Sequence, residues 1–427
     1  MKPLSAAFTL VFRRYRSLTV LIVILVASLV SAFATGFWLP SRLAYVIAAA
    51  IPLCYLWARV NMWGVSAEAE RRVDRLEQGQ AFEERLFVRN RNFLGKLWLE
   101  VDDPSDLPGH VAGRVLGLRR GETRSWKVTT RCERRGVFTL GPVTVSSGDP
   151  FGVFRLTRSF GHSRSILVYP KALDLTSFYL PPAQLTGEKR LRRATHHVTP
   201  NAAGIRAYEF GDSFSRIHWP STARTGDLMV KLFEMDPASD VWLVLDMEKK
   251  AHAGKGEQST EEYVIRIAAS VARYFFRANR SVGLIAFDGK LTVIEPERGL
   301  HHHVRILESL AVMKAAGDVP LAELLPKEGK RFGRQTTVLT ITPSAQEDWV
   351  AVLKAMGERG GRLACVLLEA STFGDAPDSL VVFGALAAAD IHTFMIKRSD
   401  DLLTALTSGS ETGGRMSAGV GNARSQR

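Results

Sequence analysis

The sequence predicts a protein of the α/β plus β class with three folded parts: an N-terminal helical hairpin, an antiparallel β-sandwich and a doubly wound α/β domain. Three observations predict this division. Two long apolar runs stand near the N-terminus, alternating apolar and polar segments follow between residues 75 and 171, and continuous apolar segments alternate with helical patterns between residues 241 and 408. A chain of 427 residues is also too long for one hydrophobic core.

The two apolar runs predict the hairpin, which we assign to residues 1–66. The runs cover residues 18–39 and 43–63, and the first contains no charged residue. Since about 20 helical residues cross the hydrocarbon core of a bilayer, each run is long enough to span a membrane. Pro40-Ser41-Arg42, between the runs, is the expected tip of the hairpin.

The basic residues around these runs predict their orientation. Three arginines and a lysine precede the first run, and four arginines, from Arg59 to Arg75, lie at or after the end of the second, whereas only Arg42 lies between the runs. Under the positive-inside rule, both chain ends and the soluble domains then lie in the cytoplasm. A cleaved export signal is the alternative, indicated by Phe12-Arg13-Arg14-Tyr15 and Ala32-Phe33-Ala34. The second apolar run, which follows at once, argues against it.

Residues 75–171 predict the β-sandwich. Short segments that alternate apolar and polar residues recur about every ten residues, separated by Gly, Pro, Asn and Asp, which is typical of antiparallel sheets. Within them, Arg134 to Pro142 and Asp149 to Gly152 are rich in glycine and proline, and we expect these residues to fix hairpin turns.

Residues 241–408 predict the doubly wound α/β domain. Val241 to Leu245 is continuously apolar, as in a strand covered on both faces, and Thr260 to Arg280 repeats apolar residues at helical spacing. Further strands, alternating with helices, are expected at residues 282–287, 337–342, 363–369 and 391–397. The Gly/Ser-rich tail, residues 409–427, is predicted to be disordered.

Residues 204–234 are unusually dense in charged and aromatic side chains and lie in a linker and motif region that we assign to residues 172–240. Such groups need partners if they are buried, so the segment is more than a connector. The candidate site residues are Arg206, Asp212, Arg216, His218, Trp219, Arg224, Lys231 and Glu234. This motif, with the preceding segment at 131–152, resembles the signature of the domain of unknown function 58 (DUF 58) family.

The resemblance implies a bacterial membrane protein and a set of partners. Members of the family are commonly encoded beside MoxR-type AAA+ ATPases and transglutaminase-like membrane proteins. We therefore expect a non-catalytic adaptor, anchored in the bacterial inner membrane, whose cytoplasmic domains bind such an ATPase. The lipid bilayer and a transglutaminase-like membrane protein are the other expected partners, and no cofactor is expected.

The end of the first α/β strand resembles the von Willebrand factor A domain, in which an Asp-x-Ser-x-Ser loop binds a divalent cation. Here the loop reads Asp246-Met247-Glu248-Lys249-Lys250, so both serines are missing and Lys250 takes the place of a hydroxyl ligand. Hard cations need several converging oxygen atoms. We expect no functional metal site, with Asp246 and Glu248 as the degenerate candidates.

The sequence allows two interpretations of the motif's role. One interpretation is an ion-pair network between sandwich and α/β domain, in which Asp212 pairs with Arg216 or Arg224 and Trp219 is a packed anchor. The second is a partner-binding surface.

Two other classes of function are the alternatives. A hydrolase or transferase would combine Ser213 or Ser215 with His218 and Asp212, although the motif lacks a nucleophile elbow. A metal-dependent adhesion module would use Asp246. The net charge of +13 comes without a recognisable nucleic-acid-binding module, so no nucleic-acid partner is expected.

Overall fold

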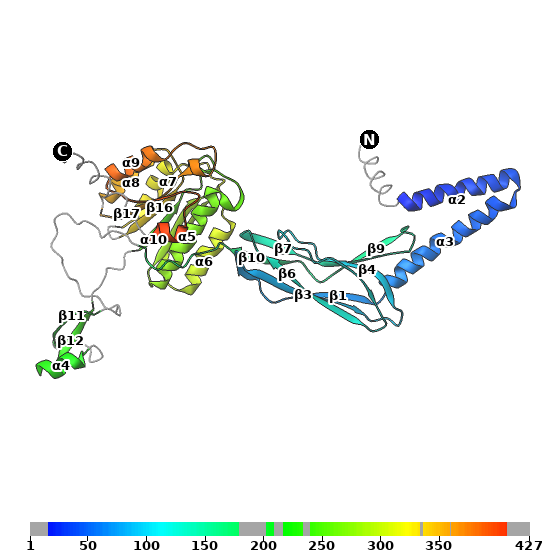
Figure 1. The fold of residues 1–427 in the computed structure, drawn as a ribbon, viewed down its shortest axis with the longest axis horizontal. Coiled ribbons are helices and arrows are strands. Elements are labelled where there is room, and N and C mark those ends of the chain that lie inside the picture. Colours follow the sequence, from blue (N-terminus) through cyan, green and yellow to red (C-terminus); the bar gives the residue numbers. More distant parts are fainter. Residues whose placement is uncertain are drawn as a thin grey trace, which may run out of the picture. The chain divides into compact units, whose positions relative to one another are not determined.

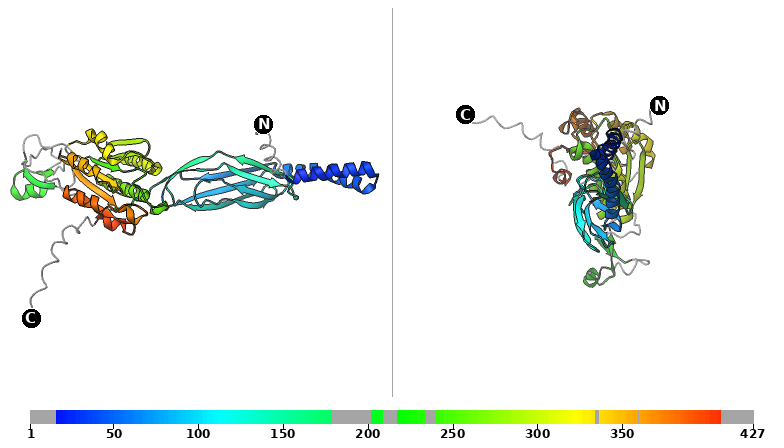
Figure 2. Two further views of the ribbon diagram at one scale, coloured as in Figure 1. Left: turned by 90° about the horizontal axis from the view of Figure 1, so that it is seen from above. Right: turned by 90° about the vertical axis from the view of Figure 1, so that its right-hand side faces the viewer.

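The computed structural model describes residues 16–178, 202–208, 217–233, 240–333, 336–358 and 360–407. The chain divides into two compact units, Met1–Tyr169 and Pro170–Arg427 (Figure 1). Figure 2 shows the same helices and strands from two further directions.

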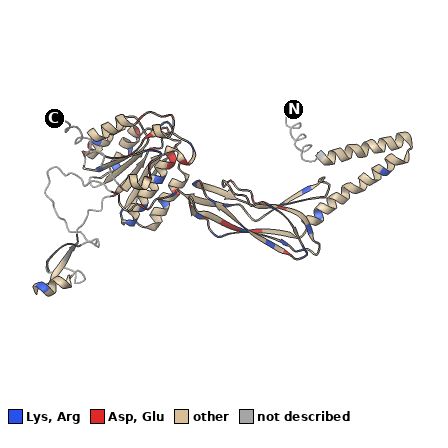
Figure 3. Cartoon of the chain, in the orientation of Figure 1, with Lys and Arg blue, Asp and Glu red and all other residues tan. Residues whose placement is uncertain are grey.

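Two antiparallel helices form the N-terminal hairpin: α2 (Arg16–Thr35) and α3 (Trp38–Met62). Both are long and apolar enough to cross a membrane, with mean hydropathies of 2.6 and 1.7. Figure 3 shows most of their length free of charged residues. The predicted tip is wrong, because the turn lies at Gly36, whose φ of +62° ends α2. Pro40 belongs to the first turn of α3, where its missing N–H costs no helical hydrogen bond.

Ten strands follow the hairpin. They are β1 (Val65–Arg71), β2 (Arg75–Glu77), β3 (Ala81–Asn90), β4 (Lys96–Asp102), β5 (Arg114–Leu118), β6 (Thr123–Arg131), β7 (Gly136–Leu140), β8 (Val143–Gly148), β9 (Arg155–Phe160) and β10 (Arg164–Tyr169). The sheet orders are β1-β3-β6, β5-β4-β8-β9 and β2-β10-β7. The strands thus begin ten residues before the predicted boundary at residue 75.

Side chains from two of these sheets form one core. Leu86 and Val128, from β3 and β6, pack with Leu99 and Val145, from β4 and β8. The antiparallel β-sandwich therefore forms as the alternating pattern predicts, with one face of each strand turned inward.

Polar contacts join α3 to the sandwich. The buried Asn61 accepts from the Leu97 N–H at 3.0 Å and donates to Ser147 Oγ at 2.5 Å. The buried Lys96 ammonium donates to the Val60 carbonyl at 2.6 Å, at the C-terminal end of the helix, where a cation is favourable. The hairpin and the sandwich are thereby held together as one unit.

The second unit contains a six-stranded sheet in the order β15-β14-β13-β16-β17-β18. Its strands are β13 (Val241–Leu245), β14 (Val282–Phe287), β15 (Leu291–Glu297), β16 (Thr337–Thr342), β17 (Arg362–Leu368) and β18 (His392–Ile396). All neighbours are parallel except β15, which pairs antiparallel with β14. The predicted parallel-rich sheet at the C-terminus is confirmed.

Helices cover both faces of this sheet. They are α5 (Thr260–Arg277), α6 (Leu300–Val312), α7 (Leu321–Glu328), α8 (Asp348–Gly357), α9 (Leu380–Ala388) and α10 (Leu402–Thr407), with short 3₁₀ turns at Gly256–Gln258, Gly329–Arg331 and Ala370–Thr372. Trp242 and Val244 of β13 pack with α7, α8 and α9 in one core. The helix α5 also contacts β13 but contributes no residue to that core. The helix α7 was not predicted, because Pro320 and Pro326 bracket a short apolar run.

Candidate functional site

The motif at 204–234 folds around a two-stranded hairpin. Strand β11 (Ala202–Ala207) pairs antiparallel with β12 (Met229–Phe233), and the helix α4 (Trp219–Thr225) precedes β12. Ile217 and Val230, both buried, form an isolated bridge that ties the start of α4 to β12. Gly226, with φ +83°, ends α4 in the left-handed conformation that favours glycine.

Only some of the predicted site residues lie in the part of the chain that the structure describes. Arg206 lies in β11 opposite Val230, and Lys231 lies in β12 opposite Ile205. His218, Trp219 and Arg224 lie at or within α4. Asp212, Arg216 and Glu234 lie outside the described residues, and so do the candidate nucleophiles Ser213 and Ser215.

His218 is bound into the local backbone. Its N–H donates to the Met229 carbonyl at 2.7 Å, and its Nδ1 lies 2.8 Å from Ser221 Oγ, one helical turn ahead. The Ser221 N–H in turn donates to the His218 carbonyl at 3.1 Å. These contacts close the first turn of α4, so His218 has a structural role at the start of the helix.

Trp219 and Arg224 are exposed on α4. The Trp219 side chain is 64% exposed, and α4 contains no buried residue. The interpretation of Trp219 as a packed anchor between sandwich and α/β domain stays a prediction; within the described part of the chain its side chain is exposed on α4. Exposed Trp and Arg are residue types enriched in protein-binding hot spots.

A second polar cluster lies at the carboxyl edge of the six-stranded sheet, where β13 and β16 end. Asp246 is buried; its Oδ2 accepts from Thr342 Oγ1 at 2.6 Å and its Oδ1 accepts from the Glu248 N–H at 3.1 Å. Burial raises the pKa of Asp246 to about 6, against these two hydrogen bonds, and the neighbouring Glu248 charge adds to the rise. Both oxygens of the carboxylate therefore accept hydrogen bonds from within the protein.

Residues that the sequence did not single out support this loop. His252 Nε2 lies 2.9 Å from the Asp246 carbonyl, and its Nδ1 lies 3.0 Å from Thr260 Oγ1. Glu248 forms a backbone bridge with Gly317, where a Cβ would come within 2.2 Å of the Phe287 carbonyl oxygen. The loop is therefore packed closely against the backbone of neighbouring segments. Sequence reasoning had no signal for His252, because it lies in an irregular segment.

Lys250, which takes the place of a hydroxyl ligand in the cation-binding loop, is exposed, and Glu248 is half-buried. Within the described ranges, the Asp246 edge gathers no set of three His, Cys, Asp or Glu side chains spaced to hold a metal ion.

Such a set is found in the sandwich. Glu84, Asp103 and His110 offer ligand atoms within 4.8 Å of one another. Arg71, however, already bridges the two carboxylates, donating to Glu84 Oε2 at 3.0 Å and to Asp103 Oδ2 at 2.6 Å. His110 Nε2 lies 3.3 Å from Glu84 Oε1, and its Nδ1 lies 3.0 Å from Thr130 Oγ1. Because a guanidinium supplies the positive charge, we interpret this group as a buried ion network.

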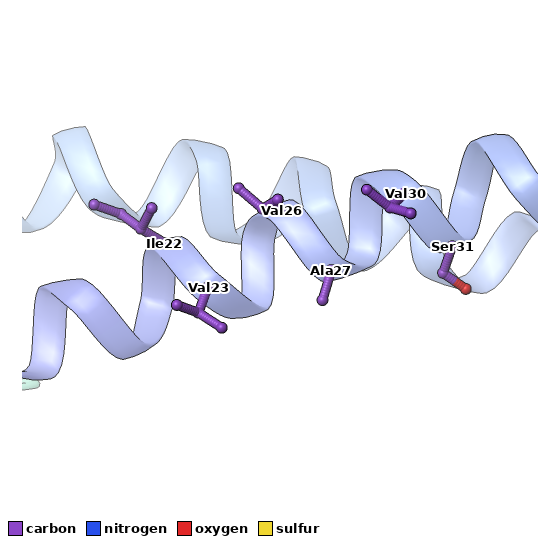
Figure 4. Close-up of a pocket in the computed structure, with 6 residues that line it drawn as sticks. All are labelled: Ile22, Val23, Val26, Ala27, Val30 and Ser31. Atoms are coloured by element: carbon purple, nitrogen blue, oxygen red, sulfur yellow. The ribbon is translucent and has the colours of Figure 1, made fainter.

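Two hollows in the described structure offer little for catalysis. One, of about 550 Å³, lies open on α2 and is lined by the largely apolar side chains of Ile22, Val23, Val26, Ala27, Val30 and Ser31 (Figure 4). The other, between α5 and α6, has a volume of about 10 Å³, which is room for one water molecule.

The second hollow is bordered by His302 and His303. Both imidazoles are buried near the start of α6. His302 Nε2 donates to the Val282 carbonyl at 2.6 Å, and His303 stacks on Phe276. Burial, together with the charges of Arg273 and His302, lowers the pKa of His303 to about 4.

A known protein family matches the part of the chain that contains the motif. Residues 204–371 match the family described as "Protein of unknown function DUF58". The predicted resemblance is confirmed for this segment, which runs from β11 through the carboxyl-edge loop of Asp246 to the 3₁₀ turn after β17.

Curated proteins are similar to part of this chain. "Uncharacterized protein YeaD" of Bacillus subtilis (strain 168) is 24% identical over 61% of this chain and 63% of its own length. "Uncharacterized protein Rv1480" of Mycobacterium tuberculosis (strain ATCC 25618 / H37Rv) is 28% identical over 38% of this chain and 53% of its own length. This chain thus spans less than two thirds of either relative.

Among solved structures, the CARDB domain of PF1109 from Pyrococcus furiosus is 12% identical, with a TM-score of 0.19. It covers 25% of this chain and 94% of that one. A likeness at this score carries no conclusion.

Proposed function

We propose that this protein is a membrane-anchored, non-catalytic adaptor that presents α4 and its hairpin to a protein partner. The single observation that carries the proposal is the exposure of Trp219, at 64%, on a helix that buries none of its residues. A large aromatic side chain left in water has a hydrophobic cost that burial against a partner would remove. Arg224, in the last turn of the same helix, adds a cation to the surface.

The proposed location follows from the hairpin. The helices α2 and α3 are each long enough to cross a bilayer, and their charge pattern favours the bacterial inner membrane with the sandwich and the α/β domain in the cytoplasm. The partner that the family resemblance favours is a MoxR-type AAA+ ATPase, with a transglutaminase-like membrane protein as a further member of the assembly. In this proposal the α/β domain is von Willebrand factor A-like, supported by Asp246 at the end of its central strand β13.

One observation favours the catalytic alternative. His218 Nδ1 lies 2.8 Å from Ser221 Oγ, the distance of a base and a nucleophile. The same contact closes the first turn of α4, however, and neither hollow described above lies at this pair. A fluorophosphonate probe separates the two functions: labelling of the wild-type protein that Ser221→Ala abolishes would establish the hydrolase.

The adaptor proposal is tested by recovery of partners from membranes. Trp219→Ala is expected to lose the partner from an affinity pull-down while leaving thermal unfolding unchanged, because exposed substitutions usually shift stability by less than about 0.5 kcal/mol. Leu300→Ala is the matched control, since Leu300 is 66% exposed on α6. Equal recovery of every co-purifying protein by the two variants would contradict the proposed role of α4.

A further inference from the structure

The exposed aromatic side chains of the sandwich are not evenly distributed. Between residues 65 and 169, which the structure describes without a gap, the exposed aromatic residues are Phe93 (62%), Trp98 (66%) and Phe151 (79%). All other aromatic side chains of the sandwich are buried or half-buried. Exposed single apolar residues are ordinary, but a concentration of aromatic ones at one place marks an interaction surface.

All three lie around the C-terminal end of α3. Phe93 follows Asn92, whose side chain donates to the Trp63 carbonyl at 3.4 Å, just after the helix ends. Trp98 follows Leu97, which is bonded to Asn61 in the last turn. Phe151 lies in the loop from β8 to β9, whose Phe154 ring packs edge-on against Tyr55 of α3.

We name the resulting ring of exposed apolar side chains the collar. It consists of Trp63, Phe93, Leu94, Leu97, Trp98 and Phe151.

The backbone is distorted where it presents two of these side chains. Successive residues of a strand normally face opposite sides, yet Leu97 and Trp98 are both exposed, at 58% and 66%. The register of β4 against β5 shifts between Lys96 and Leu99, and Trp98 has φ +49°. A bulge with a non-glycine residue at positive φ is unfavourable by itself, and bulges commonly re-aim side chains for function.

Most charged side chains in the loops beside the collar are arginines, with the half-buried Glu122 at the end of the loop from β5 to β6. The loop from β3 to β4 carries Arg91, the loop from β5 to β6 carries Arg119 and Arg120, and the last turn of α3 carries Arg59; all four side chains are exposed. The one acidic residue in the loop from β8 to β9, Asp149, is buried and accepts from the Phe151 N–H at 3.0 Å. Arginine next to aromatic side chains matches the interface of a bilayer with anionic headgroups.

The length of α3 brings the collar to the same depth as this interface. The helix meets the sandwich at Cys54, whose thiol contacts the Asp149 carboxylate, and at Tyr55, which leaves residues 38–53 before these contacts. A helical segment of that size is about 25 Å long, shorter than the roughly 30 Å of a hydrocarbon core. Full insertion of α3 therefore draws the adjoining end of the sandwich against the membrane surface.

We propose that the collar is a lipid-binding surface that inserts into the headgroup region of the membrane spanned by α2 and α3. The inference rests on the proposed membrane anchoring. It adds that the sandwich is held against the bilayer through its own loops, with the collar penetrating about 5–10 Å into the boundary of headgroups and acyl chains. The adaptor is then fixed in depth and tilt as well as tethered.

Spin labelling of the full-length protein in nanodiscs of phosphatidylethanolamine and phosphatidylglycerol tests the proposal. Single cysteines replace Phe93, Trp98 or Phe151, and Val73 and Val137, exposed at the opposite end of the sandwich, provide matched controls. Val23, 62% exposed on α2, tests the anchoring itself. The native Cys54, Cys132 and Cys365 are buried, and the labelled wild-type protein gives their background.

Collisions of each label with oxygen, which partitions into lipid, and with a water-soluble nickel chelate distinguish the outcomes. We expect oxygen to dominate at the collar and at Val23, and the nickel chelate to dominate at Val73 and Val137. Collar labels as accessible to nickel as the controls, with Val23 still in lipid, would overturn the collar and leave the anchor standing. Labels at Val23 in water would overturn the anchor. Collar labels shielded from both reagents would show that a protein covers the collar instead of lipid.

Discussion

Replacement of Arg71 by methionine should destabilise the sandwich strongly. The Arg71 guanidinium donates to Glu84 at 3.0 Å and to Asp103 at 2.6 Å, and both carboxylate side chains are fully buried. Methionine fills part of the same volume but removes the cation and its hydrogen bonds. Two carboxylates then remain in the core, with His110, 3.3 Å from Glu84, as their remaining basic neighbour in the network.

The expected cost is large because one cation serves two anions. Breaking a buried ion pair by removing one partner costs about 3–5 kcal/mol. Burial already raises the pKa of Glu84, and the hydrogen bond from Arg71 opposes that rise. Without Arg71 the pKa of Glu84 should rise further. An acid whose folded-state pKa is raised contributes stability that is complete below its unfolded pKa and is lost as the pH rises through the folded pKa. The variant should therefore be less destabilised at pH 5 than at pH 8.

Hydrogen exchange of the full-length protein in detergent, read on peptides from β3 and β6, measures this locally. A cost of this size should increase the rate of hydrogen exchange through opening of the sandwich about 10²- to 4 × 10³-fold. Arg72→Met is the matched control, because Arg72 pairs with Glu70 at 3.2 Å on the surface, where Arg72 is 80% exposed, and such pairs contribute about 0–1 kcal/mol. Equal protection in the two variants would refute the stabilising role of the network.

Three further predictions concern the other parts of the chain. Since burial raises the pKa of Asp246 to about 6, its contribution to stability should be lost as the pH rises from 4 through 6; Asp246→Asn should flatten the pH profile of unfolding of the α/β domain, and an unchanged profile would contradict this. Asn61→Leu should lower the melting temperature of the sandwich, because it leaves the Leu97 N–H without its acceptor at a cost of about 1–3 kcal/mol, and full stability would contradict the junction. Alkaline phosphatase fused after Arg427 should be inactive and fused at Ser41 active; strong activity of the C-terminal fusion would revive the export signal.

The strands and helices with a clear pattern of apolar residues could be predicted from the sequence. The strand 282–287 and the strand 337–342 were predicted at the bounds of β14 and β16, because buried parallel strands are continuously apolar between turn residues. The strand β1, Val65–Arg71, was not predicted, since its alternate positions carry small or charged residues that give little contrast.

The site was less predictable, for physical reasons. Trp is usually at least partly buried, so the 64% exposure of Trp219 depends on the packing around α4 and not on its own sequence pattern. The ion network joins Arg71, Glu84, Asp103 and His110, which are scattered along the chain. Arg71 and Glu84 meet only because β1 pairs with β3 in that register. Sheet register is a tertiary property that a single sequence does not display.

The central claim, that α4 is the contact surface of an adaptor, is tested most directly by photo-crosslinking in native membranes. Benzoylphenylalanine is introduced in place of Trp219, and in place of Leu300 as the control of equal exposure, 64% against 66%. After irradiation, mass spectrometry identifies the adducts. The adaptor predicts a specific adduct with another protein from position 219 that is missing from position 300. Adducts of the same proteins in the same amounts from both positions, or none from either, would contradict it.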